Sequence, residues 1–337
     1  MNRVIRFQQF GPAEVLVMER QPERPLAPGE VRVRVEAFGV SWADVLWRQD
    51  LAPQHARLPA GLGCELAGEV VELGAGVQGF ALGDRVASFL GHSINDYPAY
   101  GERLPMPASS LVHYPSVLDA THAAVHYMPF LNAYLGLVEV AHLQPGQRLL
   151  VTDAGQCVGP ATVQLGRALG AQVFAATPHA EDRDYLLALG AERVVVTEEE
   201  DLVGRVNRFT DGHGVDVAFD GCGGLQMGLL GDVMAPRGKL ILHGLAGGNQ
   251  TPFPACAAFE KNFKFFVHCT VDFTGSPELG IPQDREAVDR ALAQINRLTQ
   301  DGQLTTRIER VFSLDEVVEA HRCLESGTCR GRVVVRL

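Results

Sequence analysis

The sequence lacks several features that would assign it to a class at once. It contains no C-x-x-C pair, no long uninterrupted apolar run and no excess of basic side chains. Because a bilayer-spanning helix needs roughly 20 apolar residues, no transmembrane helix is predicted. The formal net charge of −11 argues against nucleic acid or an anionic membrane as a partner. The opening residues, MNRVIRFQQF, lack the apolar segment of a signal peptide.

Cysteine is sparse and irregularly spaced. The chain has seven cysteines among 337 residues. An odd, dispersed set in a chain of this size is typical of free thiols in a reducing compartment, so we expect a cytoplasmic protein. A chain of this length is long enough for two domains, each with its own core.

The clearest local pattern lies between Gly146 and Ala171. An apolar run, Leu149–Val151, precedes a turn of small residues, and apolar positions then recur at helical spacing from Pro160 to Gly170. Strand, tight turn and helix in this order open a dinucleotide-binding βαβ unit. The N–H groups at such a helix start attract a pyrophosphate.

This turn matches the dinucleotide fingerprint G-x-G-x-x-G only in part. The register falls on Ala154, Gln156 and Gly159, so only the last glycine is in place. Gln156 stands where a glycine would let the phosphate approach the backbone, and Gly155 comes one residue early. By itself the turn leaves two interpretations open, a coenzyme-binding turn or an ordinary strand–helix connection.

Four more strand patterns favour the coenzyme-binding interpretation. They are expected at 172–177, 194–196, 215–220 and 239–244. Short apolar strands that alternate with helices predict a parallel sheet covered on both faces, with ligands beyond the carboxyl ends of the strands. The coenzyme contacts predicted at these ends are Gly155, Gln156, Cys157, Val158, Gly159, Thr177, Gly221, Cys222, Gly244 and Leu245.

Residues 1 to about 125 have a different texture. Strand patterns separated by Gly and Pro turns are expected at 3–7, 15–19, 30–37, 66–73 and 85–89. Such a series of short strands with few helical periods predicts a compact β-barrel.

Three segments of this region and the C-terminal tail carry a family resemblance. The segments are GEVRVRVEAFGVSWADVLWRQ, LGCELAGEVVELGAGVQGFALGDRVASF and AYGERLPMPASSLV, and the tail is FSLDEVVEAHRCLESGTCRGRVVVRL. They resemble the medium-chain dehydrogenase/reductases, most closely the zinc-independent quinone oxidoreductase (zeta-crystallin-like) branch. The resemblance implies an α/β protein with a GroES-like β-barrel catalytic domain at 1–127. A Rossmann doubly wound parallel-sheet domain would follow at 128–268, and the segment 269–337 would complete the catalytic domain.

The resemblance also bears on metal binding. Zinc-dependent relatives use a cysteine, a histidine and a third ligand, and these positions fall on Ser41, on Cys64 and close to Asn132. A hydroxyl ligates zinc poorly and one thiol cannot hold it, so no zinc is expected. His122 and His126 stand four apart without a third ligand nearby, and we interpret them as a helix surface or pocket wall.

Without a metal Lewis acid, a quinone or an α,β-unsaturated carbonyl is the favoured substrate. Added hydride then leaves a delocalised anion that a few hydrogen-bond donors can stabilise. The resemblance places Ser41, Asp44 and Tyr100 in the active-site cleft, with Ser41 and Tyr100 as donors. The structural alternative is that Asp44 caps a helix and Tyr100 packs at the cleft edge. Ser41 and Asn132 replace family residues near the nicotinamide.

The end of the second Rossmann strand bears on the choice of coenzyme. NAD enzymes place an acidic residue there, whereas this chain has Thr177 followed by Pro and His. NADPH is therefore predicted over NADH, with Arg183 as the partner of the 2′-phosphate. By resemblance Arg332 faces the cofactor, and the phosphate-binding lysine of the family falls at Asp182. A solvated helix charge is the alternative for Arg183.

The segment 263–271 is strongly strand-prone and apolar. Because a bare apolar edge favours association, and because relatives pair the equivalent strand across a two-fold axis, we expect a homodimer through Phe265–Thr270.

Together these patterns predict a zinc-independent, NADPH-dependent oxidoreductase that transfers hydride to a small quinone or enone. Two alternatives stay open. One is an enoyl-thioester or alkenal reductase. The other is a weakly catalytic nucleotide-binding protein that serves as a redox sensor or structural partner. Gln156, Asn132 and Thr197 support the latter, because each replaces a cofactor-contacting residue of the family.

Overall fold

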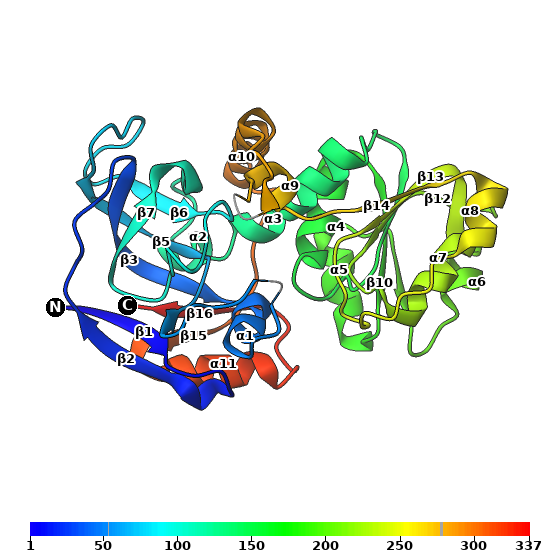
Figure 1. Ribbon diagram of the computed structural model, residues 1–337. Coiled ribbons are helices and arrows are strands. Elements are labelled where there is room, and N and C mark those ends of the chain that lie inside the picture. The colour runs from blue at the N-terminus through cyan, green and yellow to red at the C-terminus, as the bar shows by residue number, and fades with distance from the viewer. Residues whose placement is uncertain (53, 277–278) are drawn as a thin grey trace. The chain divides into compact units, whose positions relative to one another are not determined.

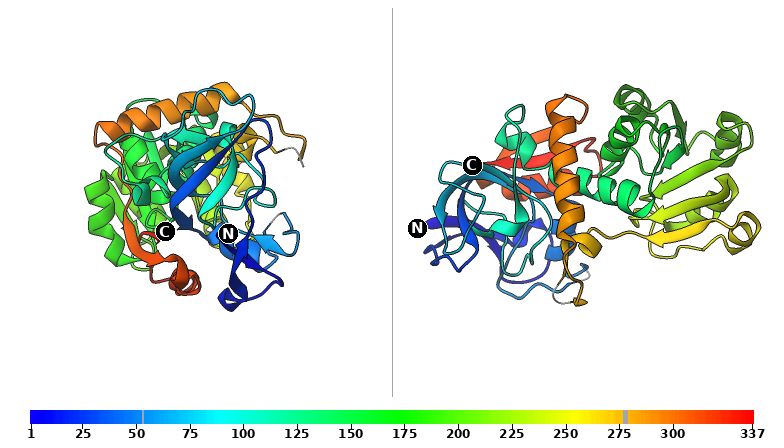
Figure 2. Two further views of the ribbon diagram at one scale, coloured as in Figure 1. Left: turned by 90° about the vertical axis from the view of Figure 1, so that its left-hand side faces the viewer. Right: turned by 90° about the horizontal axis from the view of Figure 1, so that it is seen from above.

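The computed structural model describes residues 1–52, 54–276 and 279–337 and contains two compact units. Unit 1 comprises Met1–Met128, Thr274–Gln283 and Thr305–Leu337, and unit 2 comprises Pro129–Phe273 and Asp284–Leu304. The segment 284–304 thus packs with unit 2. Both chain termini lie in unit 1, on the same side of it (Figure 1, Figure 2).

Unit 1 is built on β-sheet. Its strands are β1 (Asn2–Phe7), β2 (Leu16–Gln21), β3 (Glu30–Val40), β4 (Ala60–Gly61), β5 (Leu66–Leu73), β6 (Arg85–Ser88), β7 (Arg103–Pro107), β8 (Leu111–His113), β15 (Ile308–Ser313) and β16 (Arg332–Arg336). They form a three-stranded sheet, β2-β1-β4, and a seven-stranded sheet, β15-β16-β3-β5-β6-β8 with β7 paired to β3. Its helices are α1 (Trp42–Arg48), α2 (Ala120–Ala123) and α11 (Val317–Glu325).

Strand β3 shows how the alternating sequence becomes the core of unit 1. Val31, Val33 and Val35 point to one face and are buried in the hydrophobic cluster. The intervening Arg32 and Arg34 point to the other face and pair with glutamates of β5. Because side chains of a strand alternate between faces, this period-two pattern places β3 against the barrel interior.

Unit 2 is a doubly wound α/β domain. Its strands are β9 (Arg148–Val151), β10 (Gln172–Thr177), β11 (Arg193–Val196), β12 (Val215–Asp220), β13 (Met234–Leu242) and β14 (Lys264–Val267). Its helices are α4 (Gly159–Ala168), α5 (Arg183–Leu189), α6 (Leu202–Phe209), α7 (Met227–Val233), α8 (Ala255–Lys261) and α10 (Arg285–Gln300), while α3 (Tyr127–Tyr134) and α9 (Val271–Thr274) cross the unit boundaries.

The six strands of unit 2 are parallel and follow the order β11-β10-β9-β12-β13-β14. Helices α4 and α5 pack together on one face, and α6, α7 and α8 pack together on the other (Figure 1). Both faces are covered, which explains why the strands read as continuous apolar runs. The predicted Rossmann sheet and GroES-like barrel are both present, so the predicted fold class is confirmed.

Strand β14 is shorter than predicted and ends at Val267. The following residues turn back to α3: His268 Nε2 donates to the Asn132 carbonyl at 3.0 Å, and the Asn132 amide donates to the Thr270 hydroxyl at 3.0 Å. These side-chain contacts take the chain out of the sheet despite its β propensity. Within the described residues, no helix is long and apolar enough to cross a membrane.

Candidate active site

The sheet of unit 2 reverses its strand order between β9 and β12, which are direct neighbours. Ligands of open parallel sheets bind at such a switch point. The Thr152 hydroxyl joins the two strand ends: it donates to the Asp220 carboxylate and accepts from the Gly221 N–H at 3.1 Å. Asp220 also accepts from the N–H groups of Cys222 and Gly223, at 3.1 and 3.0 Å. The carboxylate therefore fixes the turn after β12.

The turn after β9 brings together the consecutive residues 155–159 that were predicted to contact a coenzyme. The Gly159 N–H donates to the Gln156 carbonyl at 2.8 Å, and α4 begins at Gly159. A Cβ atom at Gly159 would lie 2.5 Å from the carbonyl oxygens of Asp153 and Ala154, so a side chain cannot be accommodated there. This glycine has the close-packing role of the last fingerprint glycine.

Three carboxyl groups gather around this turn. Burial, together with the charges of Asp220 and Asp182, raises the pKa of Asp153 to about 7. Burial also raises the pKa of Asp220. We call the surface formed by the turns 153–159 and 220–223 the predicted coenzyme face of unit 2. It is therefore acidic, and close to pH 7 the Asp153 carboxyl carries a proton for part of the time.

Thr177 and Arg183, both predicted to contact the coenzyme, make different contacts at the end of β10. The Thr177 hydroxyl donates to Asp182 at 2.7 Å. The Arg183 guanidinium donates to the Val194 carbonyl at 3.1 Å and to Glu200 at 3.2 Å. Arg183 is thus bound to β11 and the segment that follows it.

The remaining predicted contacts of unit 2 lie on the rim formed after β12 and β13. The N–H of Gly247 donates to the Cys222 carbonyl at 2.6 Å, and a Cβ at Gly244 would lie 2.5 Å from the Gly221 carbonyl oxygen. Leu245 is exposed beside them. Burial raises the pKa of the Cys222 thiol to about 11, so this thiol stays protonated.

In unit 1 the structure brings Ser41, Asp44 and Tyr100 together. Ser41 caps α1, and its hydroxyl and its backbone N–H each donate to the same Asp44 oxygen at 2.8 Å. Tyr100 is buried, stacks on Phe38 and lies 3.4 Å from Nε2 of His321. Burial raises the pKa of Asp44 to about 6, against the opposing effect of the Ser41 and Tyr100 hydrogen bonds. Burial holds the pKa of Tyr100 well above its usual value.

Arg332, the other predicted site residue of unit 1, is paired with the buried Glu65. Burial raises the pKa of Glu65 to about 7, although the Arg332 charge opposes the shift. The adjacent Cys64 is buried, and its Sγ lies 3.9 Å from the sulfur of Met128. Burial raises the pKa of the Cys64 thiol far above its usual value.

The three positions at which zinc-dependent relatives have their ligands do not fit the metal. Zinc needs a deprotonated thiol or a neutral imidazole, and here the Cys64 thiol stays protonated. The Ser41 hydroxyl is bonded to Asp44, and the Asn132 amide is bonded to Thr270. In the part of the chain that the structure describes, no group of three His, Cys, Asp or Glu side chains is placed to hold a metal.

Comparison with known proteins identifies the family. A model of the alcohol dehydrogenase GroES-like domain matches residues 27–115, and a model named zinc-binding dehydrogenase matches residues 189–335. The quinone oxidoreductase of Pseudomonas aeruginosa is 31% identical over 337 residues, covering 99% of both chains. This chain belongs to the medium-chain dehydrogenase/reductases, in the quinone oxidoreductase branch.

Two further similarities bear on function. The crystal structure of Escherichia coli quinone oxidoreductase complexed with NADPH has a TM-score of 0.86 at 25% identity and covers 99% of this chain and 100% of its own. The human synaptic vesicle membrane protein VAT-1 homolog is 26% identical over 97% of this chain and 84% of its own length. The predicted family is confirmed. The switch point, with its tight turn and Gly159, fits the nucleotide that medium-chain dehydrogenases bind there.

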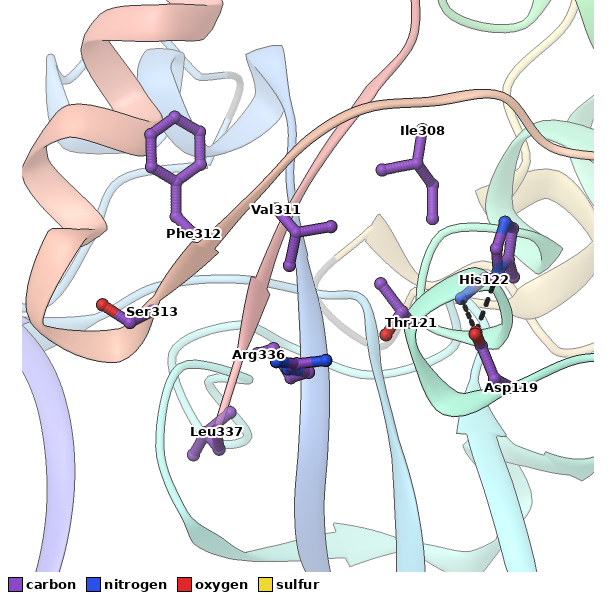
Figure 3. A pocket seen from close by; sticks show the side chains of 9 residues that line it. All are labelled: Asp119, Thr121, His122, Ile308, Val311, Phe312, Ser313, Arg336 and Leu337. Atoms are coloured by element: carbon purple, nitrogen blue, oxygen red, sulfur yellow. Dashed lines mark hydrogen bonds and ion pairs between the residues drawn. The ribbon is translucent and has the colours of Figure 1, made fainter.

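Unit 1 also contains a pocket of about 760 Å³ away from these predicted site residues (Figure 3). It is lined by Asp119, Thr121, His122, Ile308, Val311, Phe312, Ser313, Arg336 and Leu337. His122 donates its backbone N–H to Asp119 at 2.8 Å, and its ring Nδ1 lies at the same distance from that carboxylate. His122 is therefore part of a helix cap and a pocket wall.

Sequence reasoning missed the acidic groups of the coenzyme face. Asp153 follows the end of β9 by two residues and Asp220 is the last residue of β12, and those positions were the available signal for both. Asp182 was recognised only as the residue that stands where the family has a phosphate-binding lysine. Its return to the turn after β9 could not be read from the chain, because it depends on how the loop after β10 folds back.

Proposed function

We propose that this chain is a zinc-independent oxidoreductase that reduces a quinone or an α,β-unsaturated carbonyl at the expense of a reduced nicotinamide coenzyme. The observation that carries the proposal is the glycine-packed turn at the switch point of unit 2, in a chain of the quinone oxidoreductase branch. When bound, the coenzyme supplies the hydride. The overall reaction adds one hydride and one proton to the acceptor, which gives a hydroquinone or a saturated carbonyl.

The residues of unit 2 bind and orient the coenzyme. The turn 155–159 would receive the diphosphate at the start of α4, and the rim at Gly221, Cys222, Gly244 and Leu245 would face the nicotinamide half. Asn132 is held by Thr270 beside the neutral His268, whose pKa burial lowers. Its fixed amide is proposed as a further contact to the nicotinamide.

The Ser41–Asp44 pair of unit 1 would supply the proton. With Asp44 ionised, the Ser41 hydroxyl points its proton at the carboxylate. With Asp44 protonated, which its pKa of about 6 permits near neutral pH, Ser41 can donate to the acceptor oxygen and recover a proton from Asp44. Tyr100 would favour the ionised form of Asp44, because it lowers the pKa of that carboxyl. Arg332 is paired with Glu65 and would hold that carboxylate in place.

The sequence-based preference for NADPH agrees with the coenzyme of the E. coli relative. The contacts that Thr177 and Arg183 make at the end of β10 weigh against NADPH. An enoyl-thioester or alkenal reductase remains the alternative within the same chemistry. A weakly catalytic nucleotide-binding protein is the alternative outside it, supported by Gln156, Asn132 and Thr197, which replace cofactor-contacting residues of the family. The prediction of a cytoplasmic protein rests on its seven free cysteines.

A turnover screen tests this proposal. The purified chain would be assayed with NADH and NADPH against 1,4-benzoquinone, 9,10-phenanthrenequinone and a series of 2-alkenals, following loss of reduced nicotinamide. Turnover of a quinone or alkenal is the expected result. Coenzyme binding without turnover of any acceptor would favour the nucleotide-binding alternative, and no binding of either coenzyme would overturn the proposal.

A further inference from the structure

The Asp182 carboxylate lies at the end of β10, over the turn that follows β9. Its Oδ2 accepts from the Thr177 hydroxyl at 2.7 Å, and Thr177 is the last residue of β10. A Cβ atom built on Gly155 would lie 2.1 Å from the same oxygen. Asp182 ends a short 3-10 turn, Ala180–Asp182, that returns the chain to the strand end, and it is 2% exposed.

In a dinucleotide-binding sheet, the side chains at the end of the second strand determine the choice between NADH and NADPH. The adenosine ribose sits at the end of the second strand, where an acidic side chain selects a free 2′-hydroxyl and a basic one accepts a 2′-phosphate. The sequence shows no carboxylate directly after Thr177, but the fold brings one back five residues later. We infer that Asp182 excludes the 2′-phosphate and makes NADH, rather than NADPH, the preferred coenzyme of this chain. The inference rests on the proposed function for the presence of a coenzyme.

The surrounding charges support the same preference. A phosphomonoester carries close to two negative charges at neutral pH. It would meet Asp182 in a buried position, where charges are screened weakly, and Asp153 and Asp220 lie close enough for their charges to interact.

The basic groups nearby are engaged elsewhere. Arg183, the predicted phosphate partner, donates to Glu200 and to the Val194 carbonyl. Arg205 also pairs with Glu200, at 3.1 Å. His179 comes two residues after the last residue of β10, and its backbone N–H donates to the Thr177 hydroxyl at 3.3 Å.

Calorimetric titration of the full chain at pH 8 with NADH and with NADPH tests the inference without using catalysis. We expect NADH to bind at least about tenfold more tightly, the effect of one well-placed charge. In Asp182→Asn, NADPH affinity should rise about tenfold while NADH affinity changes little, because the amide oxygen can still accept from Thr177. Titration with 5′-AMP and adenosine 2′,5′-bisphosphate should reproduce the difference without the nicotinamide half.

The matched control is Glu181→Gln, which removes the same charge from an exposed neighbour. It should leave both affinities within about twofold, since exposed charges are well screened. Equal or tighter binding of NADPH by the unaltered chain would overturn the inference and leave the proposed function standing. An equal gain in affinity for both coenzymes in Asp182→Asn would also overturn the inference. If neither coenzyme bound, the proposed function would fall and the inference with it.

Discussion

Buried carboxyl groups recur at the proposed site, and each keeps a raised pKa for the same reason. Asp153, Asp44 and Glu65 all have pKa values of about 6 to 7, with burial as the main cause. A charged carboxylate is costly in such surroundings, so each group costs stability when it ionises. Residues retained at such a cost are candidates for function.

Ser41→Ala should lower kcat by about tenfold to a hundredfold, because the donor to the acceptor oxygen is lost. Ser41→Thr, which keeps the hydroxyl, should retain most of the activity.

In the unaltered chain kcat should fall as the pH rises through about 6, where Asp44 loses its proton. Asp44→Asn should remove this step. Steady-state kinetics from pH 5 to 8 provide the measurement, and an unchanged pH profile in Asp44→Asn would rule out the proton relay.

Asp153→Asn should stabilise the protein more at pH 8 than at pH 5. The folded-state pKa of about 7 lies above the ordinary value of 3.8 for an aspartate. The folded chain therefore binds more protons between these values, and its stability falls as the pH rises from about 4 to about 7. Asparagine removes the charge and tolerates the positive φ of 49° at this position. Thermal unfolding at both pH values tests this, and an equal change in Tm at both would contradict it.

At the level of elements, the connection from β9 to α4 sets the geometry of the coenzyme face. Its backbone bends sharply, with positive φ at Asp153 and Cys157. Gly159 then allows the helix to start directly against the strand. The missing fingerprint glycine at 156 does not prevent the turn from forming, because the Gly159 N–H closes it onto the Gln156 carbonyl.

Gly159→Ala should destabilise unit 2 by about 2 kcal/mol or more, because its Cβ would meet two backbone oxygens that cannot move independently. Coenzyme binding should weaken with it. The control is Gly228→Ala in α7, where the nearest atom to a new Cβ is 4.0 Å away. That change should be neutral or stabilising by about 0.5–1 kcal/mol, the helix preference for alanine. Urea unfolding of both variants distinguishes packing at the turn from a general effect of alanine.

At the level of the whole molecule, strand β14 leaves one side of the Rossmann sheet open. It pairs with β13, and in the described residues no strand pairs with its other edge. Phe265 is 38% exposed and Val267 is 67% exposed on this edge. An exposed apolar edge strand invites pairing with a second copy, and the chain offers no bulge or proline there to prevent it.

We therefore propose a homodimer through the segment Phe265–Thr270, and Val267→Lys should convert it to a monomer without unfolding it. A buried lysine at such an interface would be left without a counter-charge. Leu187→Lys on α5 introduces the same side chain at another exposed leucine and should leave the mass unchanged. Light scattering on a size-exclusion column measures the mass. A monomeric unaltered chain would refute the dimer.

The sequence alone determined the family, the fold class and most of the elements of unit 2. Helical and strand periods are local, and β10 and β12 have the predicted bounds. The family motifs are local as well, so their segments could be recognised before any contact was known. The strand–turn–helix pattern also placed Gly155–Gly159 together, and the family resemblance placed Ser41 with Asp44, since each group lies within a few consecutive residues.

Only the tertiary structure decided which side chains meet across the fold. Arg183 turns to Glu200, and Asp182 turns to Thr177 and Gly155, although the two residues are adjacent in the chain. The direction of each depends on the backbone path after β10 and on the groups it meets there. Burial is likewise a property of the packed molecule, and it is burial that raises the pKa values of Asp153 and Asp44. Contacts between distant segments, and the low polarity they create, have no counterpart in a local sequence pattern.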